Sequence, residues 1–253
     1  LFSDIDLRYV RGFDMFLQKR GCCGNTRKFY FKALRAILNR ANAEGVGSVA
    51  TYPFGRGGFE VSKLEEATAK RYLPAAELSK LKSTTASNPQ CEYARKLFLF
   101  SYYCYGISFI DMAMLTAAHI KQMEDGDYIV YKRQKIKRQK GVKPISIKIT
   151  PAIRQLIGSL QAASPTVDDL LLPIVTRSGY TGERLYMHIR ARYSKYQKYL
   201  RLLAEELGID FHLTSYVSRH TAAMTLQRNN IPREVISQML GHADLETTNI
   251  YLD

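Results

Sequence analysis

The chain has 253 residues, of which 37 are Lys or Arg and 23 are Asp or Glu, so its formal net charge at pH 7 is +14. A chain of this length can bury a sizeable core and is expected to form two domains. The positive charge fits a polyanionic partner, although a merely solvated surface would also explain it. No apolar run reaches the roughly 18 residues of a membrane span, and no signal-peptide pattern stands at the start. We therefore expect no membrane association.

The cysteines and histidines are not spaced as metal ligands. Cys22, Cys23, Cys91 and Cys104 show no zinc-site or disulfide-framework spacing, and the five histidines form no H-x-x-x-H pattern. Unpaired cysteines are typical of a reducing compartment. The sequence therefore predicts a cytoplasmic protein without a bound metal.

The N-terminal part predicts a small helical unit. Apolar and basic residues alternate at helical spacing over residues 7–19, and glycines within residues 21–24 break that pattern. Asn25 or Thr26 can cap a second helix, which keeps apolar residues on one side and ends near Gly45. The other side of this helix is basic.

Residues 49–73 are the expected linker between the two domains. They hold a glycine-rich turn around Arg56 and then a charged segment, a composition typical of connecting segments. Pro74 suits the first turn of the helix that follows. We therefore place the first domain at residues 1–48 and the second at residues 74–253.

The larger domain is predicted to be mainly helical with a small antiparallel sheet. Residues 128–131 are typical of a strand, and the alternating isoleucines of residues 145–149 predict a second strand with one buried face. Between them, seven cations crowd a hairpin around Gly141: Lys132, Arg133, Lys135, Lys137, Arg138, Lys140 and Lys143. Like charges this close repel one another unless they are solvated or paired with phosphate. The hairpin is therefore either a DNA contact or a solvated loop.

Helices are expected again after the hairpin. Residues 187–207 predict a long helix with Arg192 and Lys195 on its exposed side. Cap and turn residues then predict short helices over residues 214–228 and 232–241, followed by a third near the C-terminus. Tight turns between such helices bring distant residues together.

An ordered run of motifs occupies the C-terminal part of the chain. It consists of Tyr216-Val217-Ser218-Arg219-His220, then Leu240-Gly241-His242, and then Tyr251, nine residues after His242. This run resembles the tyrosine recombinase (phage integrase) family, in which a box of the form H-x-x-R-H is followed by L-G-H and, nine residues later, by a tyrosine. The flanking residues 213–217 and 108–113 are most similar to integrases of Bacteroides-type conjugative transposons and mobile elements.

The resemblance covers nearly the whole chain and implies both a fold and an activity. The fold is a SAM-like helical core-binding domain, truncated at its N-terminus, joined to a mixed α/β catalytic domain. The activity is site-specific recombination, in which DNA is cleaved and rejoined through a 3′-phosphotyrosyl bond on Tyr251 without a cofactor. The implied partners are double-stranded recombination sites in the bacterial nucleoid, further copies of the chain in a synaptic homotetramer, and accessory DNA-bending proteins.

Three of the implied catalytic residues act directly on the phosphate. By resemblance, Tyr251 is the nucleophile, and His242 donates a hydrogen bond to the phosphate. Arg219 clamps a non-bridging oxygen, since its planar guanidinium matches phosphate geometry and stays charged. Phosphoryl transfer of this kind depends mainly on positioning and charge stabilisation.

The resemblance also implies a general acid and two supporting residues. Lys135 corresponds to the lysine that protonates the departing 5′ oxygen, a role worth roughly 10²–10⁴ in rate. Arg133 or Lys137 takes this role if the register differs by a residue or two. His220 and Asp111 support the catalytic groups without direct participation.

Two positions depart from the family's pattern. Tyr216 stands where the box opens with histidine, and a phenol can donate to a phosphate oxygen but is not a good base at neutral pH. Ser108 stands where the first catalytic arginine belongs. Arg95 is our candidate for a relocated arginine, which requires the chain to reverse near residues 104–106. The alternative for Arg95 is a cation on a helix surface.

Ten cations on the basic helix, the linker, the hairpin and the later long helix are candidate DNA contacts: Lys28, Arg35, Arg56, Lys132, Arg133, Lys137, Arg138, Lys140, Arg192 and Lys195. Two other functions stay open. A type IB topoisomerase shares the phosphotyrosine intermediate but relaxes supercoils, and the L-G-H to tyrosine spacing favours recombination over it. A DNA-binding regulator would keep the fold without catalysis, and the departures at Tyr216 and Ser108 favour it.

Overall fold

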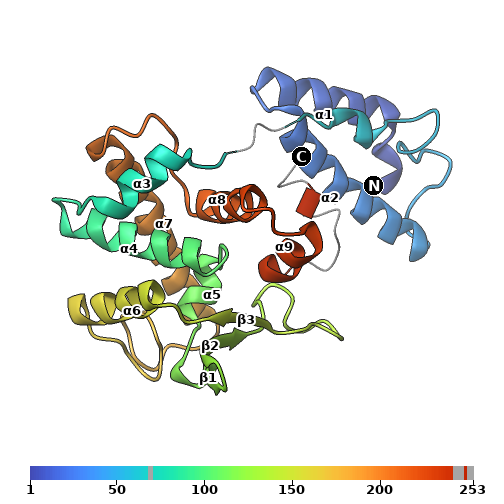
Figure 1. The fold of residues 1–253 in the computed structure, drawn as a ribbon. Coiled ribbons are helices and arrows are strands. Elements are labelled where there is room, and N and C mark those ends of the chain that lie inside the picture. The colour runs from blue at the N-terminus through green and yellow to red at the C-terminus, as the bar shows by residue number, and fades with distance from the viewer. Residues whose placement is uncertain (68–70, 242–247, 250–253) are drawn as a thin grey trace. The chain divides into compact units, whose positions relative to one another are not determined.

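The computed structural model describes residues 1–67, 71–241 and 248–249 (Figure 1). Its internal contacts divide the chain into two compact units, residues 1–69 (unit 1) and residues 70–253 (unit 2).

Unit 1 is helical, with an aromatic core. Its elements are η1 Phe2–Asp4, α1 Leu7–Lys19, α2 Gly24–Ala43 and η2 Val61–Leu64. Phe31 of α2 is fully buried and packs against the rings of Phe54 and Phe59. Arg27 donates to both carboxylate oxygens of Asp14, at 2.9 and 3.0 Å, and this ion pair ties α2 to α1.

α2 begins earlier than the sequence predicted, because the predicted cap is used elsewhere. Cys23 holds the N-cap position, and Gly24 opens the helix. The side-chain amide of Asn25 donates to Glu66 O at 2.7 Å, and its oxygen accepts from Glu66 N at 3.3 Å. A Cβ on Gly24 would lie 2.4 Å from Leu64 O. The start of α2 therefore serves as a docking point for a later segment of the chain.

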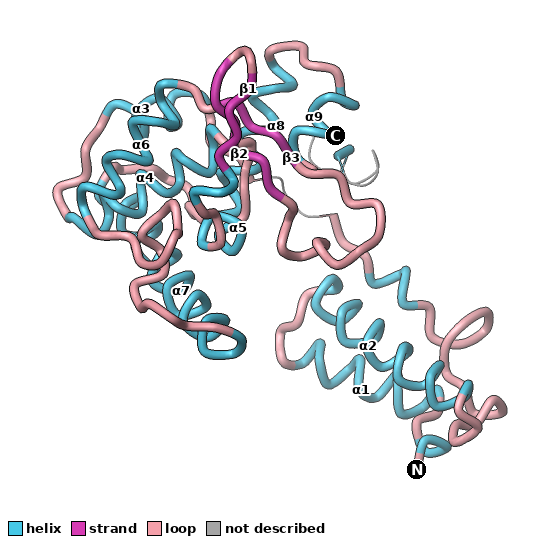
Figure 2. Tube along the Cα trace, turned by 90° about the horizontal axis from the view of Figure 1, so that it is seen from below, coloured by secondary structure: helices cyan, strands magenta, loops and turns pink. Residues whose placement is uncertain are grey.

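Unit 2 combines helices with a small sheet (Figure 2). Its helices are α3 Ala75–Ser83, α4 Pro89–Tyr103, α5 Phe109–Ala113, η3 Ala117–His119, α6 Pro151–Ala163, α7 Gly182–Glu206, α8 Ser215–Arg228 and α9 Arg233–Leu240. Its strands are β1 Ile120–Met123, β2 Gly126–Tyr131 and β3 Ile145–Lys148, which pair antiparallel in that order. Ile129 of β2 pairs with Ile120 on one side and Ile147 on the other. The predicted fold class, mainly α with a small antiparallel sheet, is confirmed, although the sequence had missed β1.

α4 lies at the centre of the hydrophobic core of unit 2. Asn88 caps it by accepting from two backbone N–H groups of the first turn, and Pro89 occupies a position where no N–H is needed. The side chains of Leu97, Phe98 and Phe100 are fully buried. The helices α6, α7 and α8 all contact α4. Burial of apolar surface, at about 25 cal/mol per Å², is the main stabilisation of this arrangement.

The C-terminal helices α8 and α9 follow their predicted limits. Thr214 holds the N-cap position of α8, which ends at Arg228. Pro232 precedes α9, and Gly241 ends it with a φ of 64°, in the left-handed region that favours glycine. By contrast, α7 begins at Gly182, several residues earlier than predicted.

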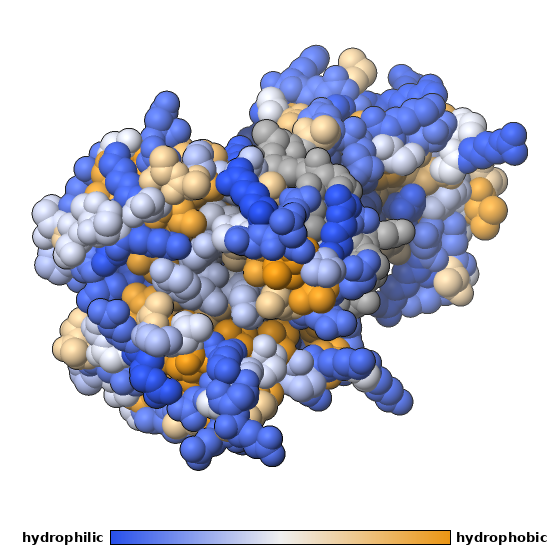
Figure 3. Space-filling view, in the orientation of Figure 1, coloured by the Kyte–Doolittle hydropathy of each residue, from blue (hydrophilic) through white to orange (hydrophobic). Residues whose placement is uncertain are grey.

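None of the helices in the described part of the chain has the length and apolar content needed to span a bilayer. On the face that Figure 3 shows, hydrophilic residues dominate, and apolar residues form scattered patches between them.

Candidate functional site

A cleft of about 460 Å³ opens in unit 2 beside the first turns of α8. The turn after α4, the start of α5, the N-terminal half of α7 and the chain after β2 also contribute to it. The side chains that line it are Ile107, Ser108, Phe109, Ile110, Arg133, Tyr186, Ile189, Arg190, Tyr193, Ser215, Tyr216 and Arg219. Three of these are arginines, and none of the described lining residues is acidic. Such a lining suits an anionic ligand.

Arg219 is held firmly at this cleft. It lies on α8 and is only 6% exposed. Its Nη1 donates to Gly106 O at 3.1 Å, and its Nη2 donates to Leu240 O. These carbonyls come from the turn after α4 and from the end of α9, so three segments of the chain fix the plane of one guanidinium.

The turn after α4 approaches Arg219 so closely that it requires glycine. Cys104 ends the helix, and Tyr105 and Gly106 then adopt positive φ angles of 53° and 74°. A Cβ on Gly106 would lie 2.3 Å from Arg219 Cβ. The chain does reverse near residues 104–106, as the Arg95 hypothesis required, and this turn brings the Gly106 carbonyl to Arg219.

A buried pair of serines joins this turn to α8. Ser101 Oγ donates to Ile107 O at 2.8 Å and lies 2.8 Å from Ser218 Oγ. Ser218 Oγ also donates to Ser215 O at 2.7 Å. The relative placement of Gly106 and Arg219 is therefore supported by a hydrogen-bonded network on the neighbouring turn.

α7 holds the first turn of α8, and Tyr216 projects from that turn. Gln197 Oε1 accepts from Ser215 N at 2.9 Å, and Tyr193 Oη lies 3.0 Å from Ser215 Oγ. Tyr216 is 55% exposed, and its ring packs edge to face against that of His220, with the ring centroids 4.8 Å apart. Tyr216 thus lines the cleft and packs against the His220 imidazole, and their roles as donor and support stay predictions.

Asp111 fixes the chain that leaves β2. It is 3% exposed, its Oδ2 accepts from Ser108 Oγ at 2.6 Å, and its Oδ1 accepts from Gln134 N at 2.7 Å. Ser108 is also the N-cap of α5, since its Oγ accepts from Asp111 N. Burial raises the pKa of the neighbouring Tyr131, and the Asp111 carboxylate raises it further, against the opposing effect of Arg219 and Arg133. Asp111 therefore anchors the start of α5 to the chain that leaves β2, and its charge acts on Tyr131 in the sense opposite to Arg219 and Arg133.

Arg133, the second residue after β2, reaches the end of α9. It is half-buried, and its Nη1 donates to Gly241 O at 3.1 Å. The sequence had proposed Arg133 as a DNA contact or a substitute acid. One of its guanidinium nitrogens donates to a protein carbonyl, and both proposed roles stay predictions.

The remaining cations of the hairpin are solvent-exposed. They are Lys132, Lys135, Lys137, Arg138, Lys140 and Lys143. Within the described residues, no carboxylate forms an ion pair with any of them. Lys135, the expected general acid, is not among the residues that line the cleft. Their charges are therefore available to an anion that covers the hairpin.

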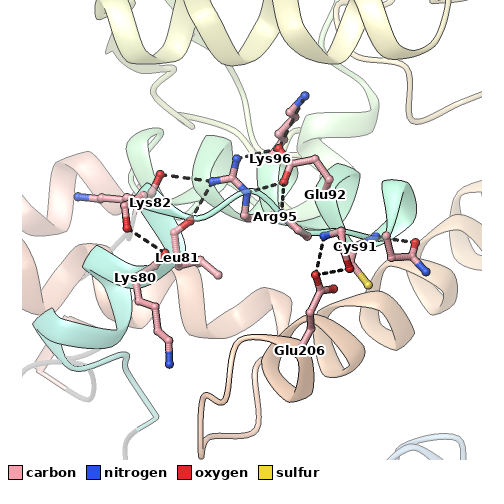
Figure 4. Close-up of polar contacts among 12 residues, drawn as sticks. Lys80, Leu81, Lys82, Cys91, Glu92, Arg95, Lys96 and Glu206 are labelled. Carbon is pink, nitrogen blue, oxygen red and sulfur yellow. Dashed lines mark hydrogen bonds and ion pairs between the residues drawn. The ribbon is translucent and has the colours of Figure 1, made fainter.

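Arg95 lies apart from the cleft, in a buried ion pair within α4 that also reaches a carbonyl of α3 (Figure 4). It is 8% exposed. Its Nε and Nη2 each donate to Glu92 at 2.7 Å, and its Nη1 donates to Leu81 O at 2.9 Å. Burial alone would raise the pKa of Glu92, but the hydrogen bonds from Arg95 and from Ala86 N hold it below its ordinary value.

This placement of Arg95 corrects both readings of it that the sequence allowed. Every guanidinium nitrogen already donates to a protein oxygen, so the relocated-clamp hypothesis finds no support here. The residue is not an exposed helix cation either, because it is buried. The pairing of Glu92 and Arg95, three residues apart on one helix, was the sequence signal for this structural role.

The other predicted DNA contacts divide into two groups. Arg35, Arg56 and Lys195 are exposed. Lys28 instead forms an ion pair with Glu65 at 2.6 Å, and Arg192 Nε donates to Ile174 O at 3.1 Å. The two remaining catalytic candidates, His242 and Tyr251, lie outside the described residues. Among the described residues, no three His, Cys, Asp or Glu side chains are grouped to hold a metal ion.

The sequence reasoning did not single out the cleft face of α7. Tyr186, Arg190 and Tyr193 lie at spacings of four and three residues, and all three line the cleft. That helical spacing of exposed aromatic and basic side chains was the available signal. The contact between Gly106 and Arg219 had no local signal, because the two residues are 113 positions apart.

Two family models match the chain. Residues 71–253 match the phage integrase family, and residues 1–60 match the phage integrase SAM-like domain. Together these matches cover both units.

Curated relatives match shorter segments. A 54-residue segment is 43% identical to the tyrosine recombinase XerD of Halalkalibacterium halodurans and covers 21% of this chain and 18% of that protein. A 114-residue segment is 31% identical to the tyrosine recombinase XerC of Rhodospirillum centenum and covers 45% of this chain and 31% of that protein. The matched segments thus span less than a third of either relative.

Solved structures resemble the chain over nearly its whole length. The XerH site-specific recombinase bound to a difH substrate has a TM-score of 0.67 at 18% identity, covering 98% of this chain and 67% of that chain. The Tn1549 transposon integrase in complex with transposon right end DNA has a TM-score of 0.69 at 12% identity, covering 98% of this chain and 81% of that chain. A lambda integrase dimer bound to a COC′ core site has a TM-score of 0.67 at 15% identity, covering 99% and 81%. At these identities the likeness shows a shared fold.

Proposed function

Because this chain belongs to the phage integrase family, we propose that it is a site-specific DNA recombinase that cleaves and rejoins strands through a 3′-phosphotyrosyl bond on Tyr251. Residues 74–253 carry the chemistry, and residues 1–48 are a core-binding domain that holds the duplex. The covalent bond conserves the energy of the broken backbone, so no cofactor is needed.

The observation that carries this proposal is the setting of Arg219. Its guanidinium lines a cleft that also holds Arg133 and Arg190, and two backbone carbonyls orient it. A planar guanidinium held in advance at the position where phosphate charge develops is an efficient form of transition-state stabilisation. Arg219 is therefore the proposed clamp on the scissile phosphate.

The other catalytic roles follow from the same phosphate position. Tyr216 donates its hydroxyl hydrogen to a phosphate oxygen from the rim of the cleft, which its exposure permits. Lys135 protonates the departing 5′ oxygen when the hairpin closes on DNA, and His242 donates to the phosphate. A phenol is mostly neutral at pH 7, since its reference pKa is about 10. Tyr251 therefore requires nearby positive charge, such as that of Arg219 and Lys135, to favour its ionised form.

The exposed cations of the hairpin support a duplex as the substrate. They carry no ion pairs to carboxylates within the described residues, and they are close neighbours in sequence. Phosphate contacts would relieve their mutual repulsion, and each would contribute about −0.9 to the slope of log affinity against log salt. Arg35, Arg56 and Lys195 would add further backbone contacts.

We also infer a role in a mobile element. The residues around Ser108 and Leu213 resemble those of Bacteroides-type integrases, and the similarity to a transposon integrase structure is consistent with this assignment. Synapsis of two sites by four copies of the chain, with accessory DNA-bending proteins, is the assembly that we propose.

The proposal can be tested with a pool of nicked suicide duplexes that carry a randomised central region. The chain should form a covalent adduct that survives SDS, and Tyr251→Phe should abolish the adduct while duplex binding is retained. An adduct that persists in Tyr251→Phe would reject the nucleophile. Binding without any adduct would favour a regulator, and relaxation of supercoiled plasmid without strand exchange between two sites would favour a topoisomerase.

A further inference from the structure

Two guanidinium groups from outside α9 hold its C-terminal end. The last carbonyls of a helix have no partners within the helix. Here Leu240 O accepts from Arg219 Nη2, and Gly241 O accepts from Arg133 Nη1 at 3.1 Å. Positive charge at a helix C-terminus is also favoured by the helix dipole. The end of α9 is thus tied to α8 by one arginine and to the hairpin by the other.

Gly241 fits closely against the hairpin. Its φ is 64°, and a Cβ there would lie 2.3 Å from Ile145 Cδ1 and 3.3 Å from Arg133 Cδ. Ile145 is the first residue of β3. The point at which the chain leaves α9 is therefore set by both ends of the hairpin, Arg133 at its start and Ile145 at its finish.

The start of the hairpin is anchored on its other side as well. Gln134 N donates to Asp111 Oδ1 at 2.7 Å, and Asp111 is itself fixed by Ser108. Residues 133 and 134 are therefore held between α5 and α9. Lys135 is the next residue along the chain.

We propose that Arg133 is a positioning residue that sets the hairpin segment bearing Lys135 relative to the C-terminal end of α9 at Gly241. This inference rests on the proposed function, in which Lys135 and the C-terminal residues His242 and Tyr251 act on one phosphate. Lys135 lies two residues after Arg133, and His242 follows Gly241 in the sequence, so the hydrogen bond from Arg133 to Gly241 O joins a sequence neighbour of each. Arg133 acts through this bond, without contact to the reacting atoms.

The first test measures single-turnover adduct formation and equilibrium binding, with duplexes recovered from the randomised pool. Arg133→Gln should lower the adduct rate at saturating DNA by about 10²-fold, because a displacement of about 1 Å in a reacting group has an effect of that size. On this inference the Arg133 guanidinium is engaged by Gly241 O and not by a phosphate, although it lines the cleft, so DNA affinity and its salt dependence should match the unaltered chain. Arg133→Lys keeps a cationic donor and should restore part of the rate.

Two control variants separate positioning from charge. Arg154→Gln removes a guanidinium that donates to Asp127 at 2.7 Å on another part of the sheet, and it should change neither rate nor affinity. Arg138→Gln removes an exposed hairpin cation and should reduce the salt slope by about 0.9. If Arg133→Gln also reduces the salt slope by about 0.9, Arg133 is a phosphate contact and the inference is overturned.

A second test needs no DNA. Hydrogen exchange should accelerate in Arg133→Gln both in the last turn of α9 and around Gln134, whereas Arg154→Gln should change neither. Gly241→Ala, which forces Ile145 or Arg133 to move, should reproduce the effect at both places. Exchange that changes at one place alone would overturn the coupling, even if Arg133→Gln lowers the melting temperature.

The two tests keep this inference distinct from the proposed function. Failure of the unaltered chain to form any adduct would reject the proposed function, and hydrogen exchange would still decide whether Arg133 couples the segments. A normal adduct rate in folded Arg133→Gln would reject the inference alone.

Discussion

Arg95 and Arg219 are two buried arginines of unit 2, with exposed fractions of 8% and 6%, but their surroundings differ. Arg95 forms two hydrogen bonds with the Glu92 carboxylate, which neutralises its charge within the protein. Arg219 donates to the carbonyls of Gly106 and Leu240 and lines a cleft. These backbone carbonyls orient the Arg219 guanidinium and carry no formal charge. Among the described residues, the acceptor is therefore a carboxylate for Arg95 and carbonyls for Arg219, at a similar degree of burial.

We expect the largest effect from Glu92→Gln, which removes the carboxylate that distinguishes the surroundings of Arg95 from those of Arg219. Removing the carboxylate leaves the Arg95 charge buried and unpaired, and breaking a mostly buried ion pair in this way costs about 3–5 kcal/mol. Denaturant unfolding should show this loss in the free energy of unfolding. Glu183→Gln, at an exposed glutamate, is the matched control and should change stability by less than about 0.5 kcal/mol. Equal, small effects of the two variants would show that the pair contributes little.

Arg219→Lys should produce the next largest effect, on the cleavage rate. Lysine keeps the charge but lacks the planar fork, so adduct formation should fall about 10²–10³-fold, as on the loss of a preorganised donor. Arg95→Lys should show the opposite pattern, with lower stability and an unchanged rate in the folded protein. Single-turnover kinetics and thermal unfolding of both variants measure the contrast. A rate loss in Arg95→Lys as large as that in Arg219→Lys would contradict the distinction.

Gly106→Ala should have a smaller effect, and it tests the turn that orients Arg219. The positive φ strains any other residue by about 1–2 kcal/mol, and the new Cβ would also lie 2.3 Å from Arg219 Cβ. Gly141→Ala is a matched control, since Gly141 has a similar φ of 77° and no atom within 4 Å of an added Cβ. Only Gly106→Ala should lower the adduct rate. Equal losses of stability with no difference in rate would mean that the turn does not position Arg219.

The smallest expected effect is an acid dependence of stability that arises from Glu92. Its pKa in the folded protein is lowered, so the stabilisation is complete above its ordinary value of 4.5 and is lost as the pH falls toward the folded value. The melting temperature should therefore fall more steeply in the unaltered chain than in Glu92→Gln as the pH falls below about 4.5 and through the lowered pKa of Glu92. Parallel pH profiles would exclude Glu92 as the source.

The sequence predicted the parts of the fold that depend on local signals. Thr214 and Gly241 lie at the predicted ends of α8 and α9, because caps and left-handed turns act through neighbouring residues. The strand β1 was missed, since its sequence Ile-Lys-Gln-Met shows little apolar alternation and depends on pairing with β2. The start of α2 was misplaced, because Asn25 bonds to Glu66 instead of capping the helix.

The candidate site likewise combines residues that local patterns identified with long-range contacts that those patterns could not reveal. Arg219 was identified from its motif, whereas the chain reversal near Gly106 entered only as a requirement of the Arg95 hypothesis. The carbonyls that orient Arg219, and the bond from Arg133 to Gly241, join residues more than twenty positions apart, so no local pattern could reveal them. Arg95 was misassigned although Glu92 stood three residues before it, because the family pattern required an arginine that the local ion pair had already engaged.

The most direct measurement is a structure of Tyr251→Phe bound to a duplex recovered from the randomised pool. Our account predicts a backbone phosphate in the cleft, with a non-bridging oxygen about 2.7–2.9 Å from a guanidinium nitrogen of Arg219, and Arg95 still paired with Glu92. A duplex bound elsewhere on the protein, with no phosphate within hydrogen-bonding distance of Arg219, would contradict it.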